Sequence, residues 1–234
     1  MINNLLLIGS LIFIFGAVPV AYRLFGKTGL YCMSAIATVL ANIEVTILIN
    51  AFGMEQTLGN VLFASTFLVT DILSECEGKK AANKAVWISI FSSVFFLLLS
   101  QSWMLYKPSP NDGVMDSIIG VFSNTPRLIV ASLLVYAISQ LFDVWLYHKW
   151  WEFTDKKFGN HRKYLWLRNN GSTLISQILN TFLFTVAAFA GTLEFKTLMS
   201  VFISSYIIYI VTSLLDTPVV YWARRIHEKK TLSA

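Results

Sequence analysis

The sequence predicts an all-α membrane protein, a bundle of helices that crosses a lipid bilayer several times. Of its 234 residues, 56% are hydrophobic and 13% are charged, whereas a soluble domain usually carries about 25% charged residues. Seven segments are apolar over the roughly 20 residues that one crossing needs. Basic residues are concentrated in every second loop between these segments. We expect one domain over residues 1–234, and the composition excludes a disordered chain, a disulfide scaffold and an ordinary soluble enzyme.

The seven predicted spans leave short loops between them, and six spans are the alternative count. The first span lacks the basic start and the small-residue cleavage site of a signal peptide, so we expect it to be retained. The last is longer than one crossing requires, so its ends protrude or the helix tilts. The predicted spans are residues 2–22, 29–51, 57–74, 85–106, 127–148, 171–191 and 197–223.

Lysine and arginine residues predict the orientation of the bundle. The loops after the first, third and fifth spans and the C-terminal tail together hold 15 of the 18, and the opposite side holds two. Cytoplasmic loops of membrane proteins are enriched in these residues. We therefore expect a multi-pass protein of the inner (plasma) membrane with its N-terminus outside and its C-terminus in the cytoplasm. The net charge of +5 then reflects topology, and no nucleic-acid partner is expected.

Two connecting segments carry structure of their own. Residues 149–168 mix basic and aromatic side chains, which predicts a short interfacial helix that begins at Trp150 and stops at Gly159. In the external loop 107–126, the chain turns apolar at residues 114–122. This stretch either dips into the lipid headgroups or packs as a surface loop.

Carboxylates inside the predicted spans are the first candidates for function. A charged side chain at the middle of a membrane helix costs about 2.5–3.5 kcal/mol on insertion, so each one needs an explanation. Glu44 is either a protonated core acid or a proton-coupling group. Asp71 and Glu75 either pair with the lysines of the following loop as a cytoplasmic gate or contact a ligand. The full set is Glu44, Asp71, Glu75, Asp143 and Asp216.

The fifth and sixth spans carry the same polar pattern. Gln140 and Asp143 lie on one helical face, and Gln177 and Asn180 repeat that spacing on the next span. Such residues often only hold membrane helices together. Together with Asp216 of the seventh span, however, they converge in the cytoplasmic half and predict a pocket for a small polar ligand. Carboxamides both donate and accept hydrogen bonds, so a nucleobase, a vitamin or an amino acid would fit.

The sequence lacks the signature motifs of several classes of protein. The sequence has no zinc-binding His-Glu-x-x-His, no Gly-x-Ser-x-Gly elbow and no phosphate-binding loop. We therefore expect no enzyme, no metal, no cofactor and no ATPase of its own. A retinal protein would need a lysine within the last span, but Lys196 precedes that span and Lys229 follows it.

Three ordered motifs narrow the function further. The first covers residues 71–82, the second runs from Arg127 to Ser139-Gln140-x-x-Asp143, and the third runs from Trp166-x-Arg168 to Asn180-Thr181. Together they resemble the queuosine precursor transporters of the vitamin uptake transporter group. Two residues depart from the pattern of that family. Glu77 stands in place of the usual Tyr, and Asn180 stands where Asp is expected.

The resemblance implies uptake of 7-cyano-7-deazaguanine or 7-aminomethyl-7-deazaguanine, with queuine as a further ligand, by secondary or facilitated transport. The amide and carboxyl groups of the fifth and sixth spans would contact the base. Asp71 and Glu75 would belong to the site or its gate, and Arg127 and Arg168 would orient helices or flank the entrance. The expected partners are this small molecule and the lipid bilayer, and a homo-oligomer is compatible with the sequence.

Other functions stay open at this point. The chain could be the substrate-binding subunit of a vitamin importer with a separate ATPase, for which the small residues Ala37 and Ala41 offer a docking face. It could also carry another nucleobase-like compound. A heptahelical sensor and an intramembrane enzyme are further alternatives.

Overall fold

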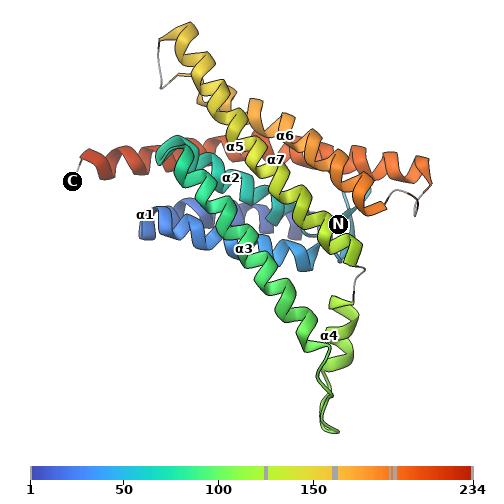
Figure 1. The fold of residues 1–234 in the computed structure, drawn as a ribbon. Helices are drawn as coiled ribbons and strands as arrows, with labels where there is room; N and C mark the ends of the chain where they lie inside the picture. Colours follow the sequence, from blue (N-terminus) through green and yellow to red (C-terminus); the bar gives the residue numbers. More distant parts are fainter. Residues whose placement is uncertain (1, 124–125, 160–162, 190, 192–193, 233–234) are drawn as a thin grey trace.

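The computed structural model describes residues 2–123, 126–159, 163–189, 191 and 194–232, and it forms a bundle of helices with one small β-hairpin (Figure 1). Its elements are α1 Ile2–Glu44, β1 Leu48–Ala51, β2 Met54–Thr57, α2 Asn60–Cys76, α3 Lys79–Trp103, α4 Met115–Phe122, α5 Pro126–Phe158, α6 Leu165–Phe189 and α7 Phe195–Leu232. Among the described residues, five helices are long and apolar enough to cross a membrane, namely α1, α3, α5, α6 and α7. The predicted class, a helical membrane bundle, is confirmed.

Helix α1 consists of two antiparallel halves joined by a sharp turn. Gly26 adopts φ 61° and ψ −149° at the turn, a conformation that glycine tolerates best. A straight helix of 43 residues would be about 65 Å long. Instead, Asn3 near the start of α1 donates a hydrogen bond of 3.0 Å to the carbonyl of Asn50, just beyond its end. The halves 2–25 and 27–44 therefore correspond to the first two predicted spans.

The segment after α1 is a β-hairpin, so the predicted span 29–51 was wrong at its end. The helix stops at Glu44, and Leu48–Ala51 pairs antiparallel with Met54–Thr57. β-branched residues favour strands at this point, and the turn has positive φ at Phe52 and Gly53, as a two-residue hairpin requires. The next helix, α2, accordingly begins at Asn60 instead of residue 57 and has only 17 residues.

The boundaries of α5 and α6 also differ from prediction. Helix α5 continues through the expected interfacial segment to Phe158, and Gly159 with φ 60° follows its end, as predicted. Helix α6 begins at Leu165, six residues before the predicted span. Arg168 was therefore wrongly placed in a loop, because its side chain lies inside the helix bundle and is fully buried.

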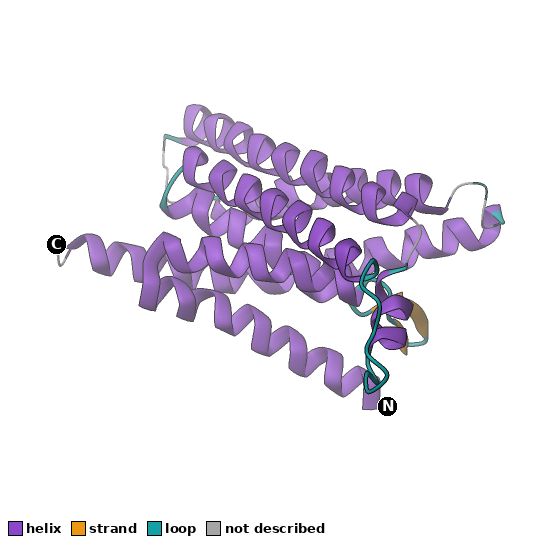
Figure 2. Ribbon diagram, turned by 60° about the horizontal axis from the view of Figure 1, so that its bottom comes forward, coloured by secondary structure: helices purple, strands orange, loops and turns teal. Residues whose placement is uncertain are grey.

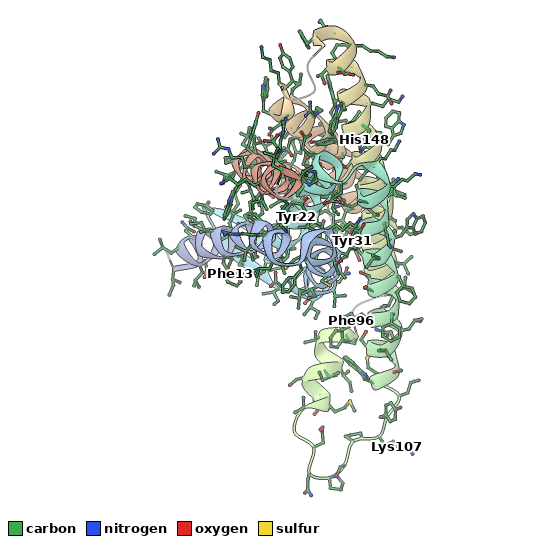
Figure 3. All side chains as sticks on the ribbon, turned by 90° about the vertical axis from the view of Figure 1, so that its left-hand side faces the viewer. Phe13, Tyr22, Tyr31, Phe96, Lys107 and His148 are labelled. Carbon is green, nitrogen blue, oxygen red and sulfur yellow. The ribbon has the colours of Figure 1, made fainter. Side chains whose placement is uncertain are left out.

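The apolar part of the external loop forms the short helix α4. The Asp112 carboxylate accepts hydrogen bonds from the backbone N–H groups of Val114 and Met115, at 3.2 and 2.8 Å, which caps the helix start. Phe122 at the end of α4 packs against Phe96 of α3 with ring centroids 5.8 Å apart. The loop before α4, which includes Lys107, extends away from the bundle (Figure 3).

Helix α2 lies at the centre of the bundle, and most of its side chains are fully buried. It contacts α1, α3, α5 and α7. The helices lie alongside one another with the N-terminus and the β-hairpin at one end and the C-terminus at the other (Figure 2). We call these the hairpin end and the C-terminal end. The outer faces expose large apolar side chains such as Phe91 and Leu98, as expected for contact with lipid.

Candidate functional site

A cavity of about 1000 Å³ lies at the hairpin end of the bundle. Its wall is formed by α1, the β-hairpin, α2, α5, α6 and α7. This volume is at the upper end of what small-molecule sites usually have. Among its lining residues, the amide and aliphatic hydroxyl side chains are Thr38, Asn42, Gln56, Thr57, Asn60, Ser132, Asn180, Thr181, Thr185, Thr197, Ser200, Ser204 and Ser205.

Three aromatic rings cluster in the wall of the cavity. The ring of Phe63 on α2 lies 5.9 Å from that of Tyr136 on α5 and 6.0 Å from that of Tyr209 on α7. All three residues line the cavity. A flat heterocycle stacks on such rings with a gain of about 1–3 kcal/mol per base.

Two amide side chains of the wall have unmet hydrogen-bonding capacity. The Asn60 carbonyl oxygen accepts from the Thr57 hydroxyl at 3.1 Å and from the Tyr209 hydroxyl at 3.3 Å, which fixes the orientation of this amide. Within the described part of the chain, the Asn60 Nδ2 and both polar atoms of the Gln56 side chain are buried without a partner. An unsatisfied buried polar group costs about 1–3 kcal/mol, and a polar ligand would remove that cost.

Of the ten predicted site residues, Asn180 lines the cavity. Its Nδ2 donates to Gln177 Oε1 at 3.3 Å. Gln140 is fully buried against α2, where its Nε2 donates to Thr66 at 2.7 Å and its Oε1 accepts from Thr70 at 3.1 Å. Gln140 and Gln177 therefore belong to a packed polar layer next to the cavity, and their part in ligand binding stays a prediction.

The three predicted aspartates lie in the same polar layer, each at most 2% exposed. Their hydroxyl and amide partners all stand on α6. Asp71 Oδ2 accepts from Thr173 at 3.0 Å, and Asp143 Oδ1 accepts from Ser176 at 2.7 Å. Asp216 Oδ1 accepts from the Asn169 amide at 2.7 Å. The structure thus brings these acids together from α2, α5 and α7, but they do not line the cavity.

Glu75 lies in a buried ion-pair cluster nearer the C-terminal end. Its carboxylate accepts from Arg168 at 2.9 Å, from Arg224 at 3.3 Å and from the Tyr147 hydroxyl at 2.7 Å. The Arg168 guanidinium also lies 4.4 Å from the centre of the Trp151 ring. The alternative in which Glu75 pairs with the lysines at 79 and 80 is therefore wrong.

Glu77, the first departure from the family motif, forms a second cluster at the same end. The Tyr22 hydroxyl donates to Glu77 Oε1 at 2.8 Å and lies 2.7 Å from His227 Nδ1. Lys27 lies 4.0 Å from the Glu77 carboxylate. This cluster ties the turn of α1 and the α2–α3 connection to the end of α7.

The two remaining predicted site residues are Glu44 and Arg127. Glu44 is the last residue of α1 and is partly exposed near the β-hairpin. Arg127 is in the first turn of α5, and its side chain lies outside the described part of the structure.

The cavity lining includes residues that sequence reasoning missed, among them Gln56, Asn60 and Tyr136. Gln56 was hidden because its segment was not expected to form a strand. Tyr136 could have been found, since it stands four residues before Gln140 and shares its helical face.

Comparison with known proteins identifies the family of the chain. Residues 57–223 match the family described as "Putative vitamin uptake transporter". The chain belongs to this family. It is also 35% identical over 225 residues, 96% of each chain, to the "Probable queuosine precursor transporter" of Bacillus subtilis (strain 168). The family predicted from the motifs is confirmed, and the chain is a multi-pass membrane transporter and not an enzyme. No solved structure matches it.

Proposed function

We propose that this protein imports queuosine precursors, 7-cyano-7-deazaguanine and 7-aminomethyl-7-deazaguanine, with queuine as a further substrate. The observation that carries the proposal is the cavity, which combines the aromatic cluster of Phe63, Tyr136 and Tyr209 with the unsatisfied amides of Gln56 and Asn60. A deazaguanine base has two flat faces for the rings and a polar edge for the amides. The name of the Bacillus subtilis relative, a probable queuosine precursor transporter, supports the same substrate class.

The proposed topology has seven spans, with the N-terminus outside and the C-terminus in the cytoplasm of the inner membrane. In this topology the turn of α1 divides the first two spans, and the short helix α2 is the third. The predicted cytoplasmic loops and tail hold most of the lysines and arginines. The cavity then opens toward the outside, and the Glu75 and Glu77 clusters close the cytoplasmic end.

The proposed mechanism is secondary or facilitated transport by alternating access. The base enters from the hairpin end and contacts Asn180, whose amide is hydrogen-bonded to Gln177. The polar layer that contains Gln140, Gln177 and the aspartates then has one of two roles. It transmits the contact to the Glu75 cluster, or its side chains reach the base after the helices move. Release requires the ion pair between Glu75 and Arg168 to separate, because it joins α2 to α6 at the closed end.

One alternative is a substrate-binding subunit of an ATP-driven importer. The small residues Ala37 and Ala41, which could have docked such a partner, instead pack against Leu62 inside the bundle. This arrangement favours a transporter that acts alone.

Rescue of tRNA modification tests the proposed substrate. A bacterial strain that lacks precursor synthesis and its own transporter would express this chain and receive each 7-deazaguanine in turn at low concentration. We expect queuosine in tRNA with the wild-type chain and none with the empty vector. A strain that expresses correctly inserted protein and still lacks queuosine with all three compounds would contradict the proposal.

A further inference from the structure

We propose that Asp71 and Asp143 form a carboxyl pair that holds one proton between them, and that this proton is the coupling ion of transport. The existence of the pair stands on its own, whereas the coupling role rests on the proposed function. The site lies in the polar layer between the cavity and the closed end.

The geometry of the two carboxyl groups requires a proton. Each one uses a single oxygen to accept from a hydroxyl of α6, Asp71 from Thr173 and Asp143 from Ser176. Those hydroxyls are about one helical turn apart on one face of α6, so the carboxyl groups that they hold lie near each other. In the described part of the chain, Asp71 Oδ1 and Asp143 Oδ2 are buried without any hydrogen-bond donor. Two carboxylate oxygens only accept, so a proton is needed to join them.

The surrounding charges do not neutralise the pair. The nearby acid on α7, Asp216, is bonded to the neutral Asn169. On α2 and α5, Glu75 and the Tyr147 hydroxyl bond to each other. The buried arginines on α6 and α7 both form ion pairs with Glu75. Among the ion pairs of the described residues, none includes either aspartate of the pair.

Burial makes two adjacent charges untenable. Asp71 and Asp143 are both fully buried, and moving a carboxylate out of water is costly unless a charge of opposite sign compensates it. Two neighbouring carboxyl groups in such a site share a proton, since both cannot ionise. The pair then carries one negative charge, which the Thr173 and Ser176 hydroxyls stabilise by donating to it.

Helix α6 connects the pair to the cavity. Asn180 lines the cavity, and the hydroxyls that hold the pair stand four and seven residues before it. At 1.5 Å per residue this is a separation of roughly 6–10 Å along the helix axis. A movement of α6 on substrate binding therefore shifts the donors that hold the pair. The pair keeps its proton while it is buried. When helix movement admits water from the C-terminal end, the proton leaves to that water, and the pair takes a new proton from water at the hairpin end before it is buried again.

Infrared spectroscopy of the purified full chain tests the shared proton without transport. At neutral pH we expect a carboxylic-acid C=O band. In the double variant Asp71→Asn/Asp143→Asn this band should be weaker by the intensity of one carboxyl group per chain. The control Asp112→Asn, at the exposed cap of α4, should leave the band unchanged. A band of unchanged intensity in the double variant, or one weaker by two carboxyl groups per chain, would overturn the shared proton.

Uptake into liposomes tests the coupling role. With radiolabelled 7-cyano-7-deazaguanine and an acidic exterior, one proton per substrate allows about tenfold accumulation for each unit of the pH gradient. Asp71→Asn and Asp143→Asn should accumulate none, yet still exchange labelled for unlabelled substrate. Accumulation driven by a sodium gradient, or gradient-driven uptake by either variant, would overturn the coupling role. An infrared band without any uptake by the wild type would leave the pair in place but overturn the coupling role and the proposed function. Uptake without the band would overturn the pair and leave the proposed function in place.

Discussion

The Arg168 Nη2 lies 2.9 Å from each carboxylate oxygen of Glu75, and both side chains are at most 3% exposed. This ion pair joins α2 and α6, which are far apart in sequence, at the end of the bundle opposite the cavity. A buried charge that loses its partner typically costs about 3–5 kcal/mol. The pair is therefore both a structural clamp and the contact that a transport cycle has to break.

The clamp predicts the effect of removing one charge. Arg168→Gln should lower the free energy of unfolding by about 3–5 kcal/mol, because the buried Glu75 carboxylate loses its closer arginine and keeps Arg224, at 3.3 Å, and the Tyr147 hydroxyl. The double variant Glu75→Gln/Arg168→Gln should recover part of that loss. Thermal unfolding in detergent measures both. The exposed pair Lys149–Glu152 is the control, and Lys149→Gln should change stability by less than about 0.5 kcal/mol. An Arg168→Gln variant as stable as that control would contradict the account.

The antiparallel halves of α1 predict a sharp difference between two glycines. A Cβ at Gly29 would lie 2.5 Å from the Ala21 carbonyl oxygen, whereas a Cβ at Gly16 would meet no atom within 4 Å. Gly29→Ala should therefore reduce the yield of folded, inserted protein and its unfolding temperature. Gly16→Ala should be neutral or slightly stabilising, because alanine favours helices by about 1 kcal/mol over glycine. Equal behaviour of the two variants would argue against the close packing of the halves.

Asn180 predicts a loss of affinity at the cavity. Asn180→Ala removes a hydrogen-bonding side chain from the lining, and we expect the KM for uptake to rise by about tenfold, as loss of roughly 1.4 kcal/mol implies. Ile178 on the same helix is 44% exposed on the outer face, so Ile178→Ala should leave KM unchanged. Equal KM values for Asn180→Ala and wild type, in correctly inserted protein, would remove Asn180 from the binding site.

The same position predicts a change in substrate preference. Asn180→Asp restores the residue expected from the family motif and adds a carboxylate to the cavity. A carboxylate attracts a cation, so the variant should favour 7-aminomethyl-7-deazaguanine, a primary amine, over the neutral 7-cyano compound. Competition between the two for uptake by wild type and variant measures this preference. An unchanged ratio would place the substituent of the base away from Asn180.

Gln56 predicts opposite effects on stability and on binding. Its amide is buried without a partner in the described structure, so the apolar Gln56→Leu should keep or raise the unfolding temperature. The same change should weaken substrate binding by roughly tenfold, because the amide is then absent when the base arrives. Binding to detergent-purified protein by calorimetry and thermal unfolding give the two values. Lower stability together with unchanged affinity would show that the amide serves the fold alone.

The sequence predicted the helical membrane architecture well, because lipid imposes long apolar segments and alternate loop charges. It also predicted that Gln140, Asp143 and Asp71 face inward, since helical spacing fixes which residues share a face. It could not predict that these groups bond directly to hydroxyls such as Ser176. Whether two polar faces enclose a cavity or close on each other depends on how near the helix axes lie, which side-chain packing decides.

The end of the second predicted span was missed for a related reason. Residues 45–51 are as apolar as a membrane helix, and only the turn at Phe52 and Gly53 marks the hairpin. Gln56 therefore escaped notice, although it lines the cavity. Arg168 was misplaced because positive charge usually marks a loop, and its partner Glu75 lies 93 residues away in the sequence.

Uptake by the purified chain in liposomes without any added ATPase tests the central claim most directly, namely that one cavity at the hairpin end takes up a flat, nitrogen-rich base for import. The account predicts saturable uptake of radiolabelled 7-cyano-7-deazaguanine that unlabelled substrate inhibits and that Asn180→Ala weakens while Ile178→Ala does not. Liposomes that contain folded protein and take up no more label than empty ones, or that need an ATP-hydrolysing partner, would contradict it.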